Sequence, residues 1–169
     1  REVVDRTARL MARWIAAGFQ HGVMNTDNFS ITGLTLDYGP YGWMERYEPQ
    51  WIANHSDHAG RYAYDQQPMV GLWNCARLGE ALHPLVGEDD ALAALEGYRG
   101  TFDAALGGLF RAKLGLTTED PADAALVAVW LELLQRSEAD YTRAFRALSQ
   151  WMPGDAAAPG RLRNVLDDP

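Results

Sequence analysis

The sequence is poor in cysteine, in lysine and in long hydrophobic runs. Its single cysteine, Cys75, cannot form a disulfide within the chain, so we expect a fold without covalent cross-links, suited to a reducing compartment. Lysine also occurs once, against 14 arginines, so Lys113 is the only lysine here that could bind a nucleotide. No apolar run approaches the roughly 18 residues that span a bilayer, and no signal-peptide pattern opens the chain. We therefore expect no membrane partner.

Positive charge is also scarce. Lys and Arg number 15 against 23 Asp and Glu, which gives a formal net charge of −8, and the basic residues are scattered. Binding to a phosphate backbone needs clustered Lys and Arg, so we expect no nucleic-acid partner. With 47% hydrophobic and 22% charged residues in 169 positions, the chain has the composition of one folded domain.

Apolar residues recur at intervals of three and four along most of the chain, which predicts amphipathic helices and a mainly α-helical fold. The expected helices cover residues 1–19 (closed by Gly18), 69–85, about 89–110 (weakened by four glycines), 120–136 and 137–151. Residues 153–160 are typical of a linker and 161–169 of a short tail remnant. Trp14, Trp73 and Trp130 fall on apolar helix faces, so we expect them in the core.

Residues 29–37 show a different pattern. Two short runs of β-branched and aromatic residues surround Gly33, which predicts a small β-hairpin. The next stretch, 39–68, is rich in Gly, Pro and aromatic residues and has no steady periodicity. Loops of that length are usually functional or disordered, and the aromatics favour an ordered, packed segment.

Polar residues gather where the first expected helix ends. Asp27 and Asn28 precede the expected hairpin and Asp37 follows it, so folding of the hairpin would bring the three together. Asp and Asn oxygens are suitable ligands for Mg²⁺, and a carboxylate beside the metal can act as a general base toward a hydroxyl. The same residue types also cap loops by bonding to their own backbone, which is the structural alternative at these positions.

The order of these residues is known from phosphotransferases. Protein kinases place a loop H-R-D-x-x-x-x-N before D-F-G, and the Asn and the second Asp bind Mg²⁺. His21 and Asn28 match the outer positions of that loop, and Asp37-Tyr38-Gly39 matches the triplet. Val23 occupies the place of the kinase catalytic Asp, and a carboxylate occurs instead at Asp27. A standard kinase would therefore lack its usual base here.

Three strings carry a family resemblance: HGVMNTDNFSITGLTLDYGPYGW, NHSDHAGRYAYDQQPMVGLWN and FRAKLGL. They resemble the selenoprotein O family, also called SelO or YdiU, of protein adenylyltransferases, from residue 1 to about 151. The resemblance implies the C-terminal lobe of a protein-kinase-like fold over 1–152, with the small β-hairpin at its catalytic loop, and a linker and tail over 153–169. It also implies that ATP binds in a flipped orientation, so that AMP is transferred to Ser, Thr or Tyr hydroxyls of proteins.

The same resemblance implies roles for individual residues. Asp27 would be the proton acceptor, and Asn28 and Asp37 would bind Mg²⁺ or Mn²⁺. Asp37 would also lie against the phosphates of ATP. The implied partners are ATP, protein substrates with hydroxyl side chains, and an N-terminal lobe of the same polypeptide that carries the glycine-rich cover and the Lys–Glu pair. We expect residues 1–169 alone to bind Mg·ATP weakly or not at all. A cytoplasmic location is expected in a bacterium, and a mitochondrial one in a eukaryote.

Two other functions remain open from the sequence. One is ordinary γ-phosphoryl transfer, with Asp27 as a displaced base. The other is a catalytically inactive helical scaffold that binds a protein partner through the aromatic segment 38–64.

Several further residues are expected to be structural. His21 should brace the loop and the Asp-Tyr-Gly turn rather than act as an acid or base. The potential metal ligands His55, Asp57 and His58 match no established site spacing. We expect them to form a packed, internally hydrogen-bonded loop with Arg61.

Overall fold

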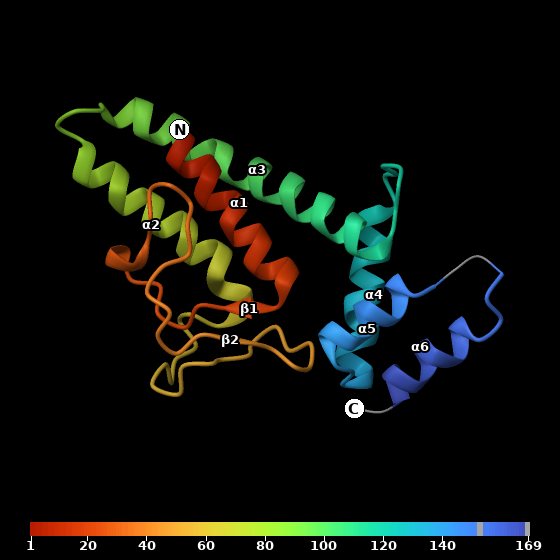
Figure 1. Ribbon diagram of the computed structural model, residues 1–169. Coiled ribbons are helices and arrows are strands. Elements are labelled where there is room, and N and C mark those ends of the chain that lie inside the picture. The colour runs from red at the N-terminus through yellow and green to blue at the C-terminus, as the bar shows by residue number, and fades with distance from the viewer. Residues whose placement is uncertain (152–153, 168–169) are drawn as a thin grey trace. The chain divides into compact units, whose positions relative to one another are not determined.

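The computed structural model describes residues 1–151 and 154–167, and most of them are helical (Figure 1). Two short strands and two 3-10 turns lie between the first two helices. In chain order the elements are α1 (Glu2–Ala17), β1 (Phe19–Gln20), η1 (Thr26–Asn28), β2 (Gly42–Trp43), η2 (Tyr64–Gln66), α2 (Gln67–Leu82), α3 (Glu88–Leu114), α4 (Asp123–Ser137), α5 (Tyr141–Ser149) and α6 (Ala158–Asp167). The prediction of a mainly α-helical fold is confirmed.

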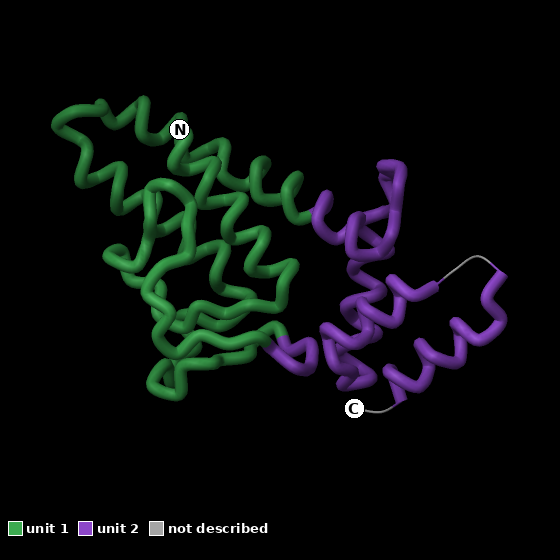
Figure 2. The backbone as a smooth tube through the Cα atoms, in the orientation of Figure 1, with its two compact units in different colours: residues 1–43, 49–106 green, residues 44–48, 107–169 purple. Residues whose placement is uncertain are grey.

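The chain divides into two compact units, which Figure 2 colours separately. Unit 1 contains residues 1–43 and 49–106, and unit 2 contains residues 44–48 and 107–169. Helix α3 is continuous from Glu88 to Leu114 despite its glycines, so it contributes residues to both units. All the residues expected to carry chemistry, from His21 to Arg61, belong to unit 1.

Helix α1 ends where the sequence predicts. Gly18 has a φ of +70°, in the left-handed region that glycine adopts without steric cost. Its N–H donates to the carbonyls of Ile15 and Trp14, which satisfies two acceptors at the end of the helix. The chain then turns directly into β1, which lies at the lower end of α1 in Figure 1.

The core of unit 1 lies between α1, α2 and the first part of α3. Helices α1 and α2 pack against each other, and side chains from α3 complete the cluster. Its buried members are Val4, Ala8, Leu10, Met11, Trp14, Phe19, Met24, Cys75 and Tyr98. Cys75 is a buried free thiol, and burial raises its pKa, which disfavours the thiolate.

The predicted hairpin over residues 29–37 is wrong. Strand β1 pairs instead with β2 in antiparallel register, with Phe19 opposite Trp43. Residues 29–37 form only a turn, in which the Gly33 N–H donates to the Ser30 carbonyl at 3.0 Å. The segment is held by side chains of α1 rather than by its own strands, since the Trp14 indole N–H donates to Thr35 Oγ1 at 2.9 Å. Its apolar residues are therefore partly left on the surface, and Leu34 is 65% exposed.

Unit 2 is built from the end of α3 and from helices α4, α5 and α6. Its buried side chains include Phe110, Trp130, Leu134, Tyr141, Ala144 and Phe145. Asp140 caps α5 by accepting the backbone N–H of Arg143 at 2.7 Å. Residues 44–48 join this unit through the Tyr141 N–H, which donates to the Glu45 carbonyl at 2.6 Å.

Helix α6 lies within the segment 153–169 that the sequence suggested as linker and tail. Ala158 at its start is buried, and the helix contacts α5 and α4. Pro159 falls in its first turn, where a missing N–H costs no helical hydrogen bond. Packing therefore favours a helix that composition alone does not predict. Residues 152–153, where the lobe boundary was predicted, lie outside the described residues.

Lys113 lies against aromatic rings in unit 2. Its ammonium nitrogen is 4.2 Å from the ring centre of Phe145 and 4.7 Å from that of Tyr141. Burial lowers the pKa of Lys113 to about 8. The aromatic faces favour the charged form and limit this fall. The structure thus gives this lysine a packing role in unit 2.

We expect Lys113 to titrate near pH 8 instead of near its ordinary value of 10.5. The unfolded chain then holds this proton more tightly than the folded chain. Consequently the contribution of Lys113 to stability rises as the pH increases from about 8 to 10.5. Carbon-13 NMR of the side chain can follow the titration, because this sequence has no other lysine. A midpoint above pH 10 would contradict the prediction.

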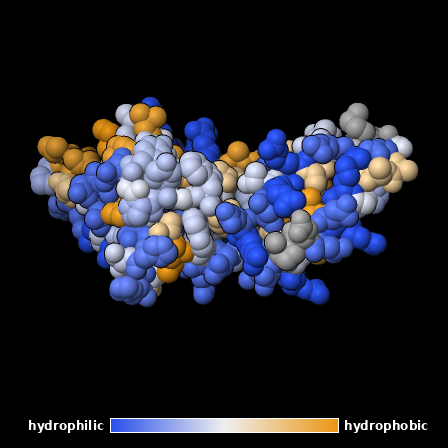
Figure 3. Space-filling view, turned by 60° about the horizontal axis from the view of Figure 1, so that its bottom comes forward, coloured by the Kyte–Doolittle hydropathy of each residue, from blue (hydrophilic) through white to orange (hydrophobic). Residues whose placement is uncertain are grey.

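The surface in Figure 3 is mostly hydrophilic, with hydrophobic residues in separate groups. Among the helices of the described residues, none is long and apolar enough to cross a membrane.

Candidate functional site

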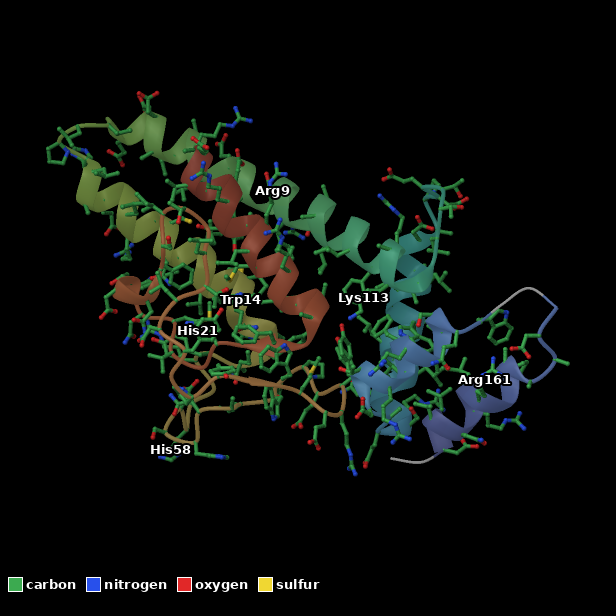
Figure 4. All side chains as sticks on the ribbon, viewed as in Figure 1. Arg9, Trp14, His21, His58, Lys113 and Arg161 are labelled. Carbon is green, nitrogen blue, oxygen red and sulfur yellow. The ribbon has the colours of Figure 1, made fainter. Side chains whose placement is uncertain are left out.

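His21 connects the loop after β1 with the segment that leads to Asp37. The ring is buried, with only 1% of the residue exposed, and it stacks on the Trp14 indole with ring centres 5.3 Å apart (Figure 4). Its Nε2–H donates to the Leu36 carbonyl at 2.7 Å, and its Nδ1 accepts the Val23 N–H at 3.4 Å. These partners require the neutral tautomer with the proton on Nε2. His21 is therefore placed as a brace, with both ring nitrogens occupied by backbone groups.

Asn28 is hydrogen-bonded to the same loop as His21. Its side-chain Nδ2 donates to the Val23 carbonyl at 3.0 Å, and its backbone N–H donates to the Asn25 carbonyl at 3.0 Å in η1. The bond through Nδ2 orients the amide and leaves Oδ1 as an acceptor. A continuous series of hydrogen bonds thus runs from Asn28 through Val23 and His21 to Leu36, the residue before Asp37. This series is called the bridge at His21 below.

Asp37 has an unusual backbone conformation. Its φ is +55°, which is uncommon for a residue other than glycine and is best tolerated by Asp and Asn. The Gly39 N–H donates back to the Asp37 carbonyl at 2.8 Å, and the preceding residues are tied to His21 and Trp14. Strained backbone of this kind often marks functional sites. The Asp37 side chain is exposed and makes no described hydrogen bond or ion pair.

Asp27 lies in η1, directly before Asn28, and is also exposed. In the described part of the chain no hydrogen bond or ion pair joins Asp27, Asn28 and Asp37 to one another. What the structure brings together is the two segments that carry them, through the bridge at His21. The Asn28 Oδ1 and the two carboxylates are hard oxygen donors, and Mg²⁺ commonly takes only one or two such groups from protein. The donor set therefore suits this ion.

Two buried glutamines that sequence reasoning missed support the loop. Gln67, at the start of α2, is fully buried, and its Oε1 accepts the His21 N–H at 3.0 Å. Its Nε2 donates to the carbonyls of Phe19 at 2.9 Å and Tyr64 at 3.3 Å. Gln20 is also fully buried, and its amide bonds to the backbone of Trp51, Ala53 and Tyr62. Nothing in their spacing signals this role, because it depends on which distant backbone groups fold against them.

The segment 51–62 packs against the loop of residues 21–28. The Asn54 side chain donates to the Gly22 carbonyl at 3.1 Å, and the Tyr62 hydroxyl donates to Asn25 Oδ1 at 2.7 Å. These bonds attach the loop that carries Asp27 to the long segment after Asp37. The part of the aromatic-rich stretch over 51–62 is therefore packed, as its composition predicts, whereas Tyr41 and Trp43 earlier in the stretch are 41% and 56% exposed.

Asp57 is engaged within its own loop. Its two carboxylate oxygens accept the backbone N–H groups of Arg61 at 2.9 Å and Tyr62 at 2.7 Å. His55 and His58 beside it are exposed. Over residues 1–151 and 154–167, no group of three His, Cys, Asp or Glu side chains is placed to hold a metal ion. The arrangement is that of the packed, internally bonded loop expected from the sequence.

Comparison with known proteins gives a consistent family match. The family model described as Protein adenylyltransferase SelO matches residues 1–161. Curated relatives named Protein nucleotidyltransferase YdiU include one from Myxococcus xanthus, 52% identical over 168 residues, which are 99% of this chain and 34% of the relative. The relative from Pectobacterium atrosepticum is 55% identical over 148 residues, which are 88% of this chain and 31% of the relative. This chain thus spans about a third of the length of the curated relatives it matches.

Proposed function

Because the chain belongs to the protein adenylyltransferase SelO family, we propose that the complete protein transfers AMP from ATP to Ser, Thr or Tyr hydroxyls of proteins. In this proposal residues 1–169 supply the general base and the metal ligands, from the C-terminal lobe of a kinase-like fold. The observation that carries it is the hydrogen-bonded bridge through His21. It supports Asn28 and the segment before Asp37 from a common buried point.

The reaction assigns a separate task to each residue. The substrate hydroxyl oxygen attacks the α-phosphorus of ATP, the bond to the β-phosphate oxygen breaks, and pyrophosphate leaves. Asp27 accepts the hydroxyl proton, a role for which its exposed position next to Asn28 is suitable. Asn28 and Asp37 would hold Mg²⁺, and that ion supplies positive charge to the phosphates when it is bound. Nucleotidyl transfer of this kind depends mostly on positioning and charge neutralisation.

Part of the site is proposed to come from elsewhere in the complete polypeptide. A lysine is the usual partner of ATP phosphates, and the lysine of this sequence packs on Phe145 and Tyr141 in unit 2. The phosphate-gripping groups and a glycine-rich cover would therefore belong to an N-terminal lobe.

The position of a label in ATP tests the proposal. When the complete protein and candidate acceptor proteins are incubated with Mg²⁺, we expect label from α-labelled ATP on protein and none from γ-labelled ATP. Transfer of the γ-label would favour phosphoryl transfer with Asp27 as a displaced base. If neither label is transferred while a protein partner still binds the aromatic segment 38–64, the inactive scaffold would replace the enzyme.

A further inference from the structure

We propose that Arg61, Trp73 and Arg77 form a docking site for an acidic segment of the protein substrate, next to the loop that carries Asp27. These three residues are called the Arg–Trp–Arg cluster below. The inference rests on the proposed function, because it assigns a substrate feature to the same site. It predicts that acceptor hydroxyls flanked by Asp or Glu are preferred.

The cluster is a stack of two cations on one aromatic ring. The guanidinium carbons of Arg61 and Arg77 each lie 5.2 Å from the ring centre of Trp73, and Arg61 is also 5.5 Å from the ring centre of Tyr62. The expectation that Trp73 is a core residue is wrong, because 42% of it is exposed. Its ring instead holds two arginine side chains at the surface. Such contacts fix the planar guanidinium groups, so less side-chain entropy is lost when they bind a carboxylate.

Both arginines are connected to the catalytic loop. Arg61 precedes Tyr62, whose hydroxyl donates at 2.7 Å to Asn25, two residues before Asp27. Arg77 lies on α2 and lines a pocket of about 270 Å³ together with Thr26, the residue directly before Asp27. A polypeptide whose hydroxyl reaches Asp27 would therefore extend past these two arginines.

Among the residues that the structure describes, neither arginine of the cluster is held in a strong ion pair, so both can bind an acidic partner. Arg77 pairs with Glu80, but both side chains are well exposed, at 43% and 60%, and exposed pairs of this kind are weak and exchangeable. The guanidinium of Arg61 takes part in no ion pair of the described residues, and the nearby Asp57 carboxylate is already occupied by backbone N–H groups. In a chain with a net charge of −8, this cluster is a local cationic site to which a carboxylate can bind.

The pocket beside Arg77 supports a polypeptide rather than a free anion as the occupant. It is lined mainly by apolar groups, including Phe29, Ile31 and Leu78. Asn74 also lines it and is 5% exposed; its Nδ2 donates to the Met24 carbonyl at 3.0 Å, whereas its Oδ1 has no hydrogen-bond partner. A buried acceptor without a donor is costly, and a small rotation of the Asn74 amide would let Oδ1 accept a peptide N–H of a docked segment. An apolar side chain of the same segment can occupy the rest of the pocket.

Matched peptides test this inference with the complete protein. One peptide carries a single serine flanked on both sides by glutamates, and its counterpart has glutamines in their place. We expect the glutamate peptide to be modified with a kcat/KM about fivefold higher, mostly through a lower KM, because exposed charge pairs contribute modest binding energy. The ratio of kcat/KM between the glutamate and glutamine peptides should fall toward one in 1 M salt, where charges are screened beyond about 3 Å.

Charge reversal provides the decisive variant. Arg61→Glu and Arg77→Glu together should abolish the preference for glutamate and create one for a lysine-flanked peptide. The matched control is Arg99→Glu on α3, since Arg99 is exposed and belongs to unit 1 but lies outside the cluster. This control should keep the preference of the unmodified protein. Far-ultraviolet circular dichroism and a thermal melt of each variant show whether it is folded.

Peptide binding separates this inference from the proposed function. Fluorescence anisotropy measures the affinity of the glutamate and glutamine peptides without any chemistry. If α-label is transferred but the two peptides react and bind equally, the docking site is wrong and the function stands. If the glutamate peptide binds better in a manner that needs Arg61 and Arg77, but no AMP is transferred, the docking site stands and the function is wrong.

Discussion

Replacing Asp37 with asparagine in the complete protein is expected to reduce AMP transfer at least about a hundredfold, as losses of preorganised charge stabilisation do. Asparagine keeps the size of the side chain and tolerates the left-handed φ of +55°, so the turn should persist. It removes the negative charge that is proposed to bind Mg²⁺ and to position the phosphates. The measurement is the rate of label transfer from α-labelled ATP at saturating Mg²⁺.

Two further variants show whether the effect comes from charge or from backbone. Asp37→Ala should lose the same activity and in addition some stability, because alanine is less favourable at positive φ. Asp103→Asn is the matched control: Asp103 lies on α3 in unit 1, paired with Arg99, and is exposed. It should leave the rate unchanged. Full activity of Asp37→Asn would remove Asp37 from the mechanism.

Replacing Gln67 with leucine is expected to lower the free energy of unfolding by about 3 kcal/mol, since each buried polar group left without a partner costs roughly 1–3 kcal/mol. The variant leaves the His21 N–H and the Phe19 carbonyl without their hydrogen bonds to the Gln67 amide. Because these groups lie at the start of the loop that carries Asp27, the proposed AMP transfer should fall as well. Chemical denaturation followed by circular dichroism measures the loss.

The neighbouring residue supplies the control for this variant. Gln66 is exposed, and among residues 1–151 and 154–167 its side chain bonds only to the exposed Asp65. Gln66→Leu should change the free energy of unfolding by no more than about 0.5 kcal/mol, as is usual at the surface. Equal effects of the two substitutions would show that the buried hydrogen bonds of Gln67 do not hold the loop.

Local rules predicted the parts of the fold that depend on neighbouring residues. The periodicity of apolar side chains and Gly18 gave α1 and its end, whereas α5 begins at Tyr141 and not at residue 137 as expected. The predicted bracing role of His21 agrees with its two backbone hydrogen bonds. The roles of Asp27, Asn28 and Asp37 stay predictions, because they concern a metal ion and substrates.

Features that depend on distant partners could not be predicted in the same way. The β-branched residues of 29–37 suggested a hairpin, but Thr35 binds Trp14 and the strands form elsewhere, between Phe19 and Trp43. Trp73 was assigned to the core from its helical spacing, although two arginines cover it at the surface. The contacts that decide the first case are remote in sequence, and Trp73 is held at the surface by Arg61 from the preceding loop together with Arg77 on its own helix.

The identity of the transferred group tests the proposed chemistry most directly. Mass spectrometry of an acceptor protein, after incubation with the complete protein and Mg·ATP, measures that group on a defined side chain. The expected result is a mass increase of one AMP group on a Ser, Thr or Tyr residue, which is absent when Asp37→Asn replaces the unmodified protein. An increase of one phosphate group, or an AMP increase that persists in Asp37→Asn, would contradict the assignment of Asp27, Asn28 and Asp37 to AMP transfer.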